Sequence, residues 1–409
     1  MSFAPSPNSR RGGAKTGLLV AGASLLALFG IAEAGFRLAG HDFSGALARH
    51  EETPIYFRKP RVPFGTVFHR RAGHQEWTGN CMSTRLRQLR ITPDPYAADP
   101  PATVRYDAAG LRNPTDLQDW EVAVVGDSFT ELGHLPDEAL FTSLLADDLG
   151  LRVKNLGMAN SGPFTELALL EHYGLSPSTR TVVVMVFGGN DRQDARAEGR
   201  YLARLEETGE RFRMPGPRAQ TSLLRALWSL ARAPRKVGSN VEETDAHDAP
   251  SSSSGDGMRD FVHAWFDGAE ERIPISFHHA PPGDLDPALK AEIDAALGRA
   301  YDAFQAFLQD KDLETWFVFV PCKLRVYQDL VTFAERDDVE RFRSWEPFDL
   351  AGQMRELAES RGFRFHDLTP AMQRAARDER LFLYNTIYDT HLNAVGSRLV
   401  AEELAKLLR

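Results

Sequence analysis

The feature that most constrains the fold is a set of short apolar runs separated by longer stretches with helical periodicity. The runs Thr181 to Phe187 and Trp316 to Val320 contain no charged side chain, which is typical of strands buried on both faces of a sheet. Strands that alternate with helices favour a parallel sheet covered by helices on both sides. We therefore expect an α/β fold with three layers. The expected strands are 122–125, 153–156, 181–187, 316–320 and 363–365, and the expected helices are 137–149, 165–173, 287–308, 347–361 and 394–408.

The first apolar run leads directly into Gly126-Asp127-Ser128. Open α/β sheets bind ligands at the carboxyl ends of their strands, so Ser128 lies where a nucleophile is expected. A serine hydroxyl is a weak nucleophile until a base accepts its proton, and the base works best when a third group fixes its tautomer. His391 is the candidate base, and Asp389, two residues before it, is the candidate orienting group.

The second long apolar run ends in Phe187-Gly-Gly-Asn-Asp191, which supplies a group for the tetrahedral intermediate. The side-chain amide of Asn190 is a natural donor to an oxyanion. The backbone N–H of Ser128 is another, if a helix begins just beyond it. Loss of one such donor costs about 3 kcal/mol of transition-state stabilisation in other hydrolases.

In their order along the chain, these motifs resemble the blocks of the SGNH, or GDSL-like, superfamily of esterases and acyltransferases. Gly126-Asp127-Ser128 resembles the first block, Asn155-Leu-Gly157 with Gly162 the second, Gly189-Asn190-Asp191 the third, and Asp389-Thr-His391 the last. The resemblance implies a flavodoxin-like strand order with the catalytic histidine near the final helix. It also implies four functional groups, namely the serine, a glycine N–H, the asparagine amide and the histidine.

Two departures from the family pattern bear on the site. The usual register of the second block places Asn160 where a glycine is expected, so both Gly162 and Asn160 are candidate N–H donors of the oxyanion hole. The last block has only Thr390 between its aspartate and histidine, where two residues are common. This shorter form resembles the alginate O-acetyltransferase-like branch.

Each motif alone also has a structural interpretation. Gly-Asp-Ser and Gly-Gly-Asn-Asp are common turn sequences, and Asp-x-His is compatible with a helix N-cap followed by a surface histidine. All three in family order, at strand ends or at the mouth of a helix, favour a catalytic site. A metal site at Asp389 and His391 lacks a nearby Cys/His cluster or a His-Glu-x-x-His helix. The sequence therefore indicates neither a metal nor a cofactor.

The amino-terminal segment, residues 1–38, indicates where the protein works. Three basic residues between positions 10 and 15 precede the uncharged stretch Gly17 to Ala32, which spans about 24 Å as a helix, against about 30 Å for a bilayer core. Continuation to Leu38 makes a membrane anchor, which we favour. Ala32-Glu33-Ala34 is alternatively a signal-peptidase site. The basic residues favour an exported body, which places the catalytic domain in the periplasm of a bacterial envelope, or outside after cleavage near Ala34.

The 409-residue chain exceeds the usual size of one domain. Residues 238–257 are rich in Ser, Asp and Glu, a composition typical of disordered segments. A helical pattern at 223–231 and an aromatic patch at 261–266 fit either a cap beside the site or a peripheral elaboration. The expected organisation is an N-terminal segment 1–38, a lead-in region 39–118 that packs on the catalytic domain, and an SGNH hydrolase domain 119–409 with an insertion at 192–284.

Charge and cysteine content exclude some functions. The net charge is −9, and no long basic stretch is interleaved with aromatics, so a nucleic-acid partner is not expected. Cys81 and Cys322 permit one disulfide in an exported chain. A buried free thiol at Cys322 is an equally acceptable outcome, because it follows an apolar strand pattern.

The favoured hypothesis is a serine esterase that acts on a small-molecule or polysaccharide ester through an acyl-serine intermediate. With a sugar hydroxyl as acceptor, the same chemistry is O-acyl transfer, such as O-acetyl transfer to a cell-envelope polysaccharide. A membrane-bound acyl donor protein is then an expected partner, besides the membrane that the N-terminal segment contacts. A noncatalytic protein of the same fold that binds glycans or partners is the third alternative, and the intact Ser, Asn, His and Asp argue against it.

Overall fold

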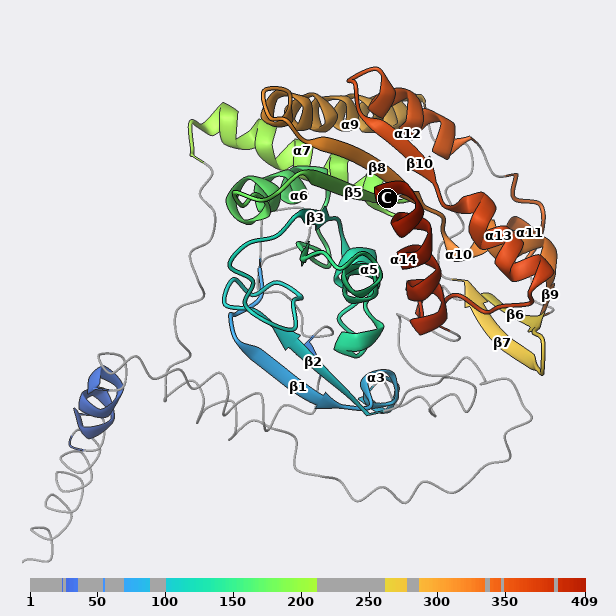
Figure 1. The fold of residues 1–409 in the computed structure, drawn as a ribbon, viewed down its shortest axis with the longest axis horizontal. Helices are drawn as coiled ribbons and strands as arrows, with labels where there is room; N and C mark the ends of the chain where they lie inside the picture. Colours follow the sequence, from blue (N-terminus) through green and yellow to red (C-terminus); the bar gives the residue numbers. More distant parts are fainter. Residues whose placement is uncertain are drawn as a thin grey trace, which may run out of the picture. The chain divides into compact units, whose positions relative to one another are not determined.

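The computed structural model (Figure 1) describes two compact units, the smaller formed by residues 1–52 and 218–244. In the smaller unit a helix covers residues 27–35, and its Leu28 and Ile31 side chains are 66% and 71% exposed. The candidate cleavage site at 32–34 lies within this helix. In the part of the chain that the structure describes, no helix has the length and apolar character needed to span a lipid bilayer. The described residues are 24, 27–35, 54–55, 70–88, 101–211, 262–277, 287–334, 339–346, 349–385 and 389–409.

Several sequence predictions lie outside the described residues. They include most of the expected anchor, the Ser/Asp-rich stretch 238–257 and the helical pattern at 223–231. The anchor, the cleavage and the cap therefore stay predictions.

A five-stranded parallel sheet forms the centre of the larger unit (Figure 1). The spatial order is β10-β8-β5-β3-β4, which in order along the chain is the 2-1-3-4-5 arrangement of flavodoxin-like folds. The predicted fold class and strand order are therefore confirmed. The strands are β3 (Val122–Val125), β4 (Val153–Asn155), β5 (Thr181–Phe187), β8 (Glu314–Val320) and β10 (Arg364–Asp367).

The continuous apolar runs arise because helices cover both faces of this sheet. Successive side chains of a strand point to opposite faces, so Val182, Val184 and Val186 of β5 enter one core while Val183 and Met185 enter the other. Each face of the sheet therefore needs its own set of apolar side chains. The first face carries α6 (Pro163–Leu169), α7 (Asp191–Thr208), α9 (Pro287–Leu308) and α12 (Leu350–Glu359), and the second carries α5 (Phe141–Leu149), α13 (Thr369–Asp378) and α14 (Ala394–Leu408), as Figure 1 shows.

The predicted elements are found with small shifts of their ends. The predicted helix at 137–149 is a 3₁₀ turn, Asp137–Ala139, followed by α5, because Leu140 between them has extended backbone. The predicted helix at 165–173 begins two residues earlier, where Pro163 occupies the first turn, and ends in a π-helical turn at Leu170–Gly174. The predicted helices 287–308 and 394–408 coincide with α9 and α14.

Helix α7 is an element that the sequence analysis missed. It occupies the first part of the stretch predicted as an insertion, and it packs against α6 and α9 in the first helical layer. Its buried positions include Asp191, Arg192, Asp194 and Glu198. Buried polar residues break the apolar periodicity from which a helix is recognised, which explains the omission.

Two smaller sheets accompany the central one. The aromatic stretch 261–266 supplies β6, whose Phe266 ring packs edge-on against Tyr327 at 4.9 Å between centroids, while Trp265 on the opposite face is 39% exposed. The first of these sheets consists of β6 (Val262–Asp267), β7 (Arg272–Phe277) and β9 (Val331–Phe333). The second is the hairpin of β1 (Gln75–Gly79) with β2 (Ala102–Tyr106), and both sheets are antiparallel. The short helices of the larger unit are α3 (Cys81–Gln88), α4 (Ser128–Glu131), α10 (Lys323–Tyr327) and α11 (Glu340–Arg343).

Cys81 and Cys322 are both buried and form no disulfide. Cys81 lies in the small apolar cluster beside the β1–β2 hairpin, and Cys322 lies in the larger core. Burial raises the pKa of the Cys322 thiol, so this thiol stays protonated and unreactive.

Candidate active site

The structure brings Ser128, His391 and Asp389 into one hydrogen-bonded chain. Ser128 begins α4 directly after β3, and the other two lie just before α14. His391 Nε2 is 2.8 Å from Ser128 Oγ, and His391 Nδ1 is 3.0 Å from Asp389 Oδ1. Residues that are 263 positions apart in sequence thus form the geometry of a serine, base and orienting acid.

The direction of the protons follows from these distances. Asp389 Oδ1 accepts from the Nδ1–H of His391, so Nε2 is left to accept the Ser128 proton. Asp127 Oδ2 is a more distant acceptor, 3.4 Å from Ser128 Oγ. The other oxygen of Asp127 accepts from the Phe129 N–H at 2.8 Å and caps α4. The imidazole is therefore the nearer acceptor for the serine hydroxyl.

Asp389 is held in place by several donors. Its Oδ1 also accepts from the His391 backbone N–H at 2.8 Å and from Asn385 Nδ2 at 2.9 Å. Burial opposes the charged form, but His391 and these hydrogen bonds outweigh it and lower the pKa of Asp389 below its usual range. The carboxyl is thus ionised at neutral pH, as an orienting acid requires.

The same pairing acts on His391. Burial alone lowers its pKa, whereas the Asp389 carboxylate raises it, and Asp127 and Glu131 add to the rise. The net result is a pKa above the ordinary histidine value of 6.5. Phe129 packs against the imidazole at 4.8 Å between ring centroids and shields it from solvent.

We expect kcat/KM for ester cleavage to rise with pH along a limb centred above pH 6.5. Only neutral His391 accepts the serine proton, and its pKa is raised above 6.5, so activity is lost as the pH falls through that pKa. Initial rates between pH 5 and 9 at low substrate concentration measure the limb. A midpoint below 6.5 contradicts the pairing with Asp389.

Asn190 lies at the same edge of the sheet as the nucleophile. Strands β3 and β5 are parallel neighbours, with Val125 beside Val184, and Ser128 and Asn190 follow their carboxyl ends. Asn190 is the N-cap residue of α7, and its side-chain amide donates one N–H to Asp194. Within the described part of the chain, the second amide N–H makes no hydrogen bond.

The two second-block candidates differ in the state of their N–H groups. The N–H of Gly162 donates to Glu198 Oε1 at 2.9 Å, so it is already engaged. A Cβ at Gly162 would meet Glu198 and the Asp194 backbone at 2.8 and 2.9 Å, which gives this glycine a packing role beside α7. Asn160 is exposed and has a left-handed backbone with φ of 62°. No hydrogen bond from its N–H is found within the described ranges.

Part of the chain matches a known family. Residues 283–409 match the family model described as SGNH hydrolase-like domain, acetyltransferase AlgX. This part of the chain is thus similar to an SGNH hydrolase-like domain. The matched part contains Asp389 and His391, while Ser128 and Asn190 lie on strands of the same sheet that precede it.

Comparison with solved structures finds distant neighbours. A protein from Lactobacillus plantarum is 12% identical with a TM-score of 0.32, over 72% of this chain and 98% of its own. The acetyl xylan esterase Est2A from the rumen bacterium Butyrivibrio proteoclasticus is 8% identical with a TM-score of 0.30, over 72% and 64% respectively. No curated protein matches the chain. At such TM-scores neither neighbour informs the reaction.

Glu131 is a buried residue that sequence reasoning missed. Three residues after the nucleophile, its carboxylate accepts from Arg71, from Tyr106 Oη at 2.5 Å and from the Ala159 N–H at 2.6 Å. The first two partners belong to the region predicted as a lead-in, and the third to the second block. Glu131 therefore joins the lead-in, the nucleophile helix and the second-block loop.

Lys323 begins α10, shortly after the end of β8. Its buried ammonium donates to the carbonyl oxygens of Ser276 at 3.1 Å and of Asn385 and Asp389 at 2.6 Å each. Burial lowers its pKa to about 7, against a smaller opposing effect of Asp389. Lys323 thus ties β7 and the segment before the catalytic histidine together.

We expect the difference in unfolding free energy between the parent and Lys323→Met to change with pH. The folded-state pKa is about 7 and the ordinary value is 10.5, so the unfolded chain binds the extra proton between these values. The parent therefore gains stability relative to the variant as the pH rises from 7 to 10, by up to about 1.4 kcal/mol per pH unit. Urea unfolding at each pH measures this, with Lys290→Met on the exposed side of α9 as control. A difference in unfolding free energy that stays constant with pH contradicts the lowered pKa of Lys323.

His134 is a buried residue that packs close to His391. Its ring centroid is 5.8 Å from that of His391, and its Nε2 is 2.9 Å from the Leu392 carbonyl oxygen. Burial lowers its pKa to about 4, so it is neutral at pH 7 and adds no charge to the site.

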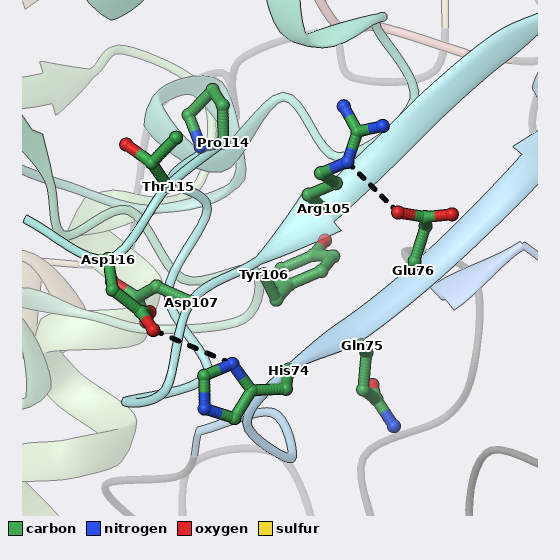
Figure 2. Close-up of a pocket in the computed structure, with 9 residues that line it drawn as sticks. All are labelled: His74, Gln75, Glu76, Arg105, Tyr106, Asp107, Pro114, Thr115 and Asp116. Carbon is green, nitrogen blue, oxygen red and sulfur yellow. Dashed lines mark hydrogen bonds and ion pairs between the residues drawn. The ribbon is translucent and has the colours of Figure 1, made fainter.

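A pocket of about 250 Å3 lies against the β1–β2 hairpin, lined by residues 74–76, 105–107 and 114–116 (Figure 2). Within this lining, Arg105 Nε donates to Glu76 at 2.9 Å and His74 Nδ1 is 3.7 Å from Asp116 (Figure 2). None of the three catalytic candidates lines it. Among the described residues, no group of three or more His, Cys, Asp or Glu side chains is arranged to hold a metal ion.

Proposed function

We propose that this protein is a serine esterase. The observation that carries the proposal is the hydrogen-bonded chain from Asp389 through His391 to Ser128 Oγ, with distances of 3.0 and 2.8 Å. The match of residues 283–409 to an SGNH hydrolase-like domain supports the same class of reaction.

The proposed reaction proceeds in two halves. Ser128 Oγ attacks the ester carbonyl while His391 Nε2 takes its proton, and the oxyanion accepts hydrogen bonds from the Asn190 amide and the N–H of Asn160. His391 then protonates the leaving alcohol, and an acyl-serine remains. Water, deprotonated by His391, attacks the acyl carbonyl, and the acid leaves as Ser128 regains its proton.

O-acyl transfer is the second candidate. The family model is described as an acetyltransferase, and the Asp389-Thr-His391 spacing resembles the same branch. In this variant a sugar hydroxyl of a cell-envelope polysaccharide replaces water in the second half, and a membrane-bound protein supplies the acyl group. The basic residues and apolar stretch before residue 38 support export and anchoring in the envelope.

The test uses the purified full chain with p-nitrophenyl acetate. We expect release of p-nitrophenol and, after acid quenching, an acetyl group on the peptide that contains Ser128, detected by mass spectrometry. Acetate as the product favours the esterase. Acetylated oligosaccharide, formed when candidate acceptors are added, favours the transferase. Absence of both p-nitrophenol and the adduct contradicts both enzymes and favours the noncatalytic alternative.

A further inference from the structure

Helix α7 presents two acidic residues on the face that carries Asn190. Residues four positions apart lie on the same side of a helix, so Asn190, Asp194 and Glu198 follow one another along α7. Both carboxyl side chains are buried, in residues that are 2% and 6% exposed. This spacing is visible in the sequence once α7 is recognised.

Asp194 controls the orientation of the Asn190 amide. Its Oδ2 accepts the hydrogen bond from Asn190 Nδ2, and an accepting oxygen requires the nitrogen end of the amide to face it. The amide plane is then fixed, and the remaining N–H points in one defined direction. Without this acceptor, the amide is free to rotate or to turn its oxygen toward a developing oxyanion, which repels it.

The backbone that carries Asn190 is also held. The Asp194 N–H donates to the Asn190 carbonyl oxygen at 2.9 Å, and Glu198 accepts from the N–H groups of Gly162 and Phe164 at 2.9 and 3.0 Å. Glu198 thereby links α7 to the start of α6. Side-chain rotation is therefore the freedom of Asn190 that Asp194 removes.

The setting of Asp194 is costly for a residue with only a packing role. Its Oδ1 has no hydrogen-bond partner among the described residues. The buried carboxyls of Glu166, Asp191 and Asp127 lie nearby, and they are close enough to repel one another. Burying an unpaired polar oxygen costs on the order of 1–3 kcal/mol. Burial raises the pKa of Asp194 to about 8, so at pH 7 it is neutral and its carbonyl oxygen still accepts.

We propose that Asp194 is a positioning residue of the oxyanion hole, which acts by orienting the Asn190 amide toward the acyl oxygen. The inference rests on the proposed serine mechanism, and it assigns to α7 a role in the chemistry of the site. A neutral acceptor suffices for this role, so the charge of Asp194 is not required.

The experiment compares kcat and KM of the full chain with those of Asn190→Ala, Asp194→Leu, Asp194→Asn and the double variant Asn190→Ala/Asp194→Leu. Asp194→Leu removes the acceptor, and we expect kcat to fall by about ten- to a hundredfold with KM little changed, below the loss of about 10² to 10³ when a donor itself is removed. Asp194→Asn retains an acceptor and is expected to keep most of kcat. The double variant is expected to be no slower than Asn190→Ala alone.

Glu166→Leu is the matched control, because it removes another buried carboxyl of the same cluster but no hydrogen bond that Asn190 makes within the described residues. We expect its kcat to equal that of the parent. Circular dichroism and unfolding midpoints verify that each variant is folded, and if Asp194→Leu is not folded, Asp194→Ala replaces it.

Three outcomes overturn the inference. The first is an unchanged kcat in Asp194→Leu, or in Asp194→Ala where that variant replaces it. The second is a loss of kcat in the double variant that equals the product of the two single losses. The third is a loss of kcat in Glu166→Leu as large as that in Asp194→Leu. In all three cases, the proposed function still holds if the parent shows turnover that depends on Ser128. Absence of Ser128-dependent turnover in the parent overturns the proposed function and this inference together.

Discussion

Replacing Ser128 by alanine is expected to lower kcat for ester cleavage by about a million-fold, to the weak activity that an oxyanion hole alone supports. The hydroxyl provides the atom that forms the new bond, and no other nucleophile is placed 2.8 Å from His391 Nε2 in the described site. Loss of the serine costs about a million-fold in kcat in a well-studied serine hydrolase, where the oxyanion hole alone retains weak catalysis. A half-buried hydroxyl is the only group removed, so we expect the fold to be unaffected.

The measurement is p-nitrophenol release by the parent and by Ser128→Ala at equal concentration. Ser161→Ala is the matched control, since Ser161 is a buried serine of the second block whose hydroxyl donates to the Met158 carbonyl oxygen at 2.6 Å. We expect this control to remain active. Turnover that survives in Ser128→Ala shows that another group attacks the ester.

The fold was predictable because its signal is carried by apolar patterns. Strands β3 and β5 have the predicted ends, and α9 and α14 coincide with the predicted helices. The two strands direct apolar side chains alternately into both cores, and each helix directs its apolar side chains into one core at helical spacing. Helix α7 was missed because buried Asp194 and Glu198 occupy positions where apolar residues are expected.

The catalytic candidates were predictable for a different reason. Ser128, His391 and Asp389 stand in short motifs whose residue types are dictated by the chemistry, and the structure brings the three together. Lys323 and Glu131 carry no such signal, because their roles depend on carbonyl and amide groups that come together only in three dimensions. A hydrogen bond to a backbone group does not depend on the type of residue that carries the group, so it cannot be recognised from the sequence.

The second-block donor shows how local packing decides what a motif leaves open. The sequence offered Gly162 and Asn160 equally. In the structure Glu198 takes the N–H of Gly162, and the close approach of α7 explains why that position is a glycine. Asn160 is an exposed residue with a left-handed backbone, and its N–H makes no hydrogen bond within the described residues, so it is the second-block donor that we propose.

Replacing Asp389 by asparagine is expected to lower kcat by about 10⁴-fold, as in another serine hydrolase. Asp389 Oδ1 accepts from His391 Nδ1 at 3.0 Å and also from the His391 backbone N–H at 2.8 Å. An asparagine that turns its NH₂ toward Nδ1 forces the proton onto Nε2, so the imidazole presents a donor to Ser128 and no longer accepts its proton. The effect is second only to loss of the nucleophile.

The measurement is kcat of Asp389→Asn across pH 6 to 10, with Asp367→Asn as control. Asp367 lies just before α13 and accepts from the Thr369 N–H at 2.8 Å, and an asparagine side chain can accept the same hydrogen bond, so the control is expected to keep its activity. Because Asp389 raises the pKa of His391, residual activity in Asp389→Asn is expected to titrate at lower pH than in the parent. A loss below tenfold, with an unmoved acid limb, means that Asp389 neither fixes the tautomer nor stabilises the imidazolium, and the base at this site is then oriented by another group.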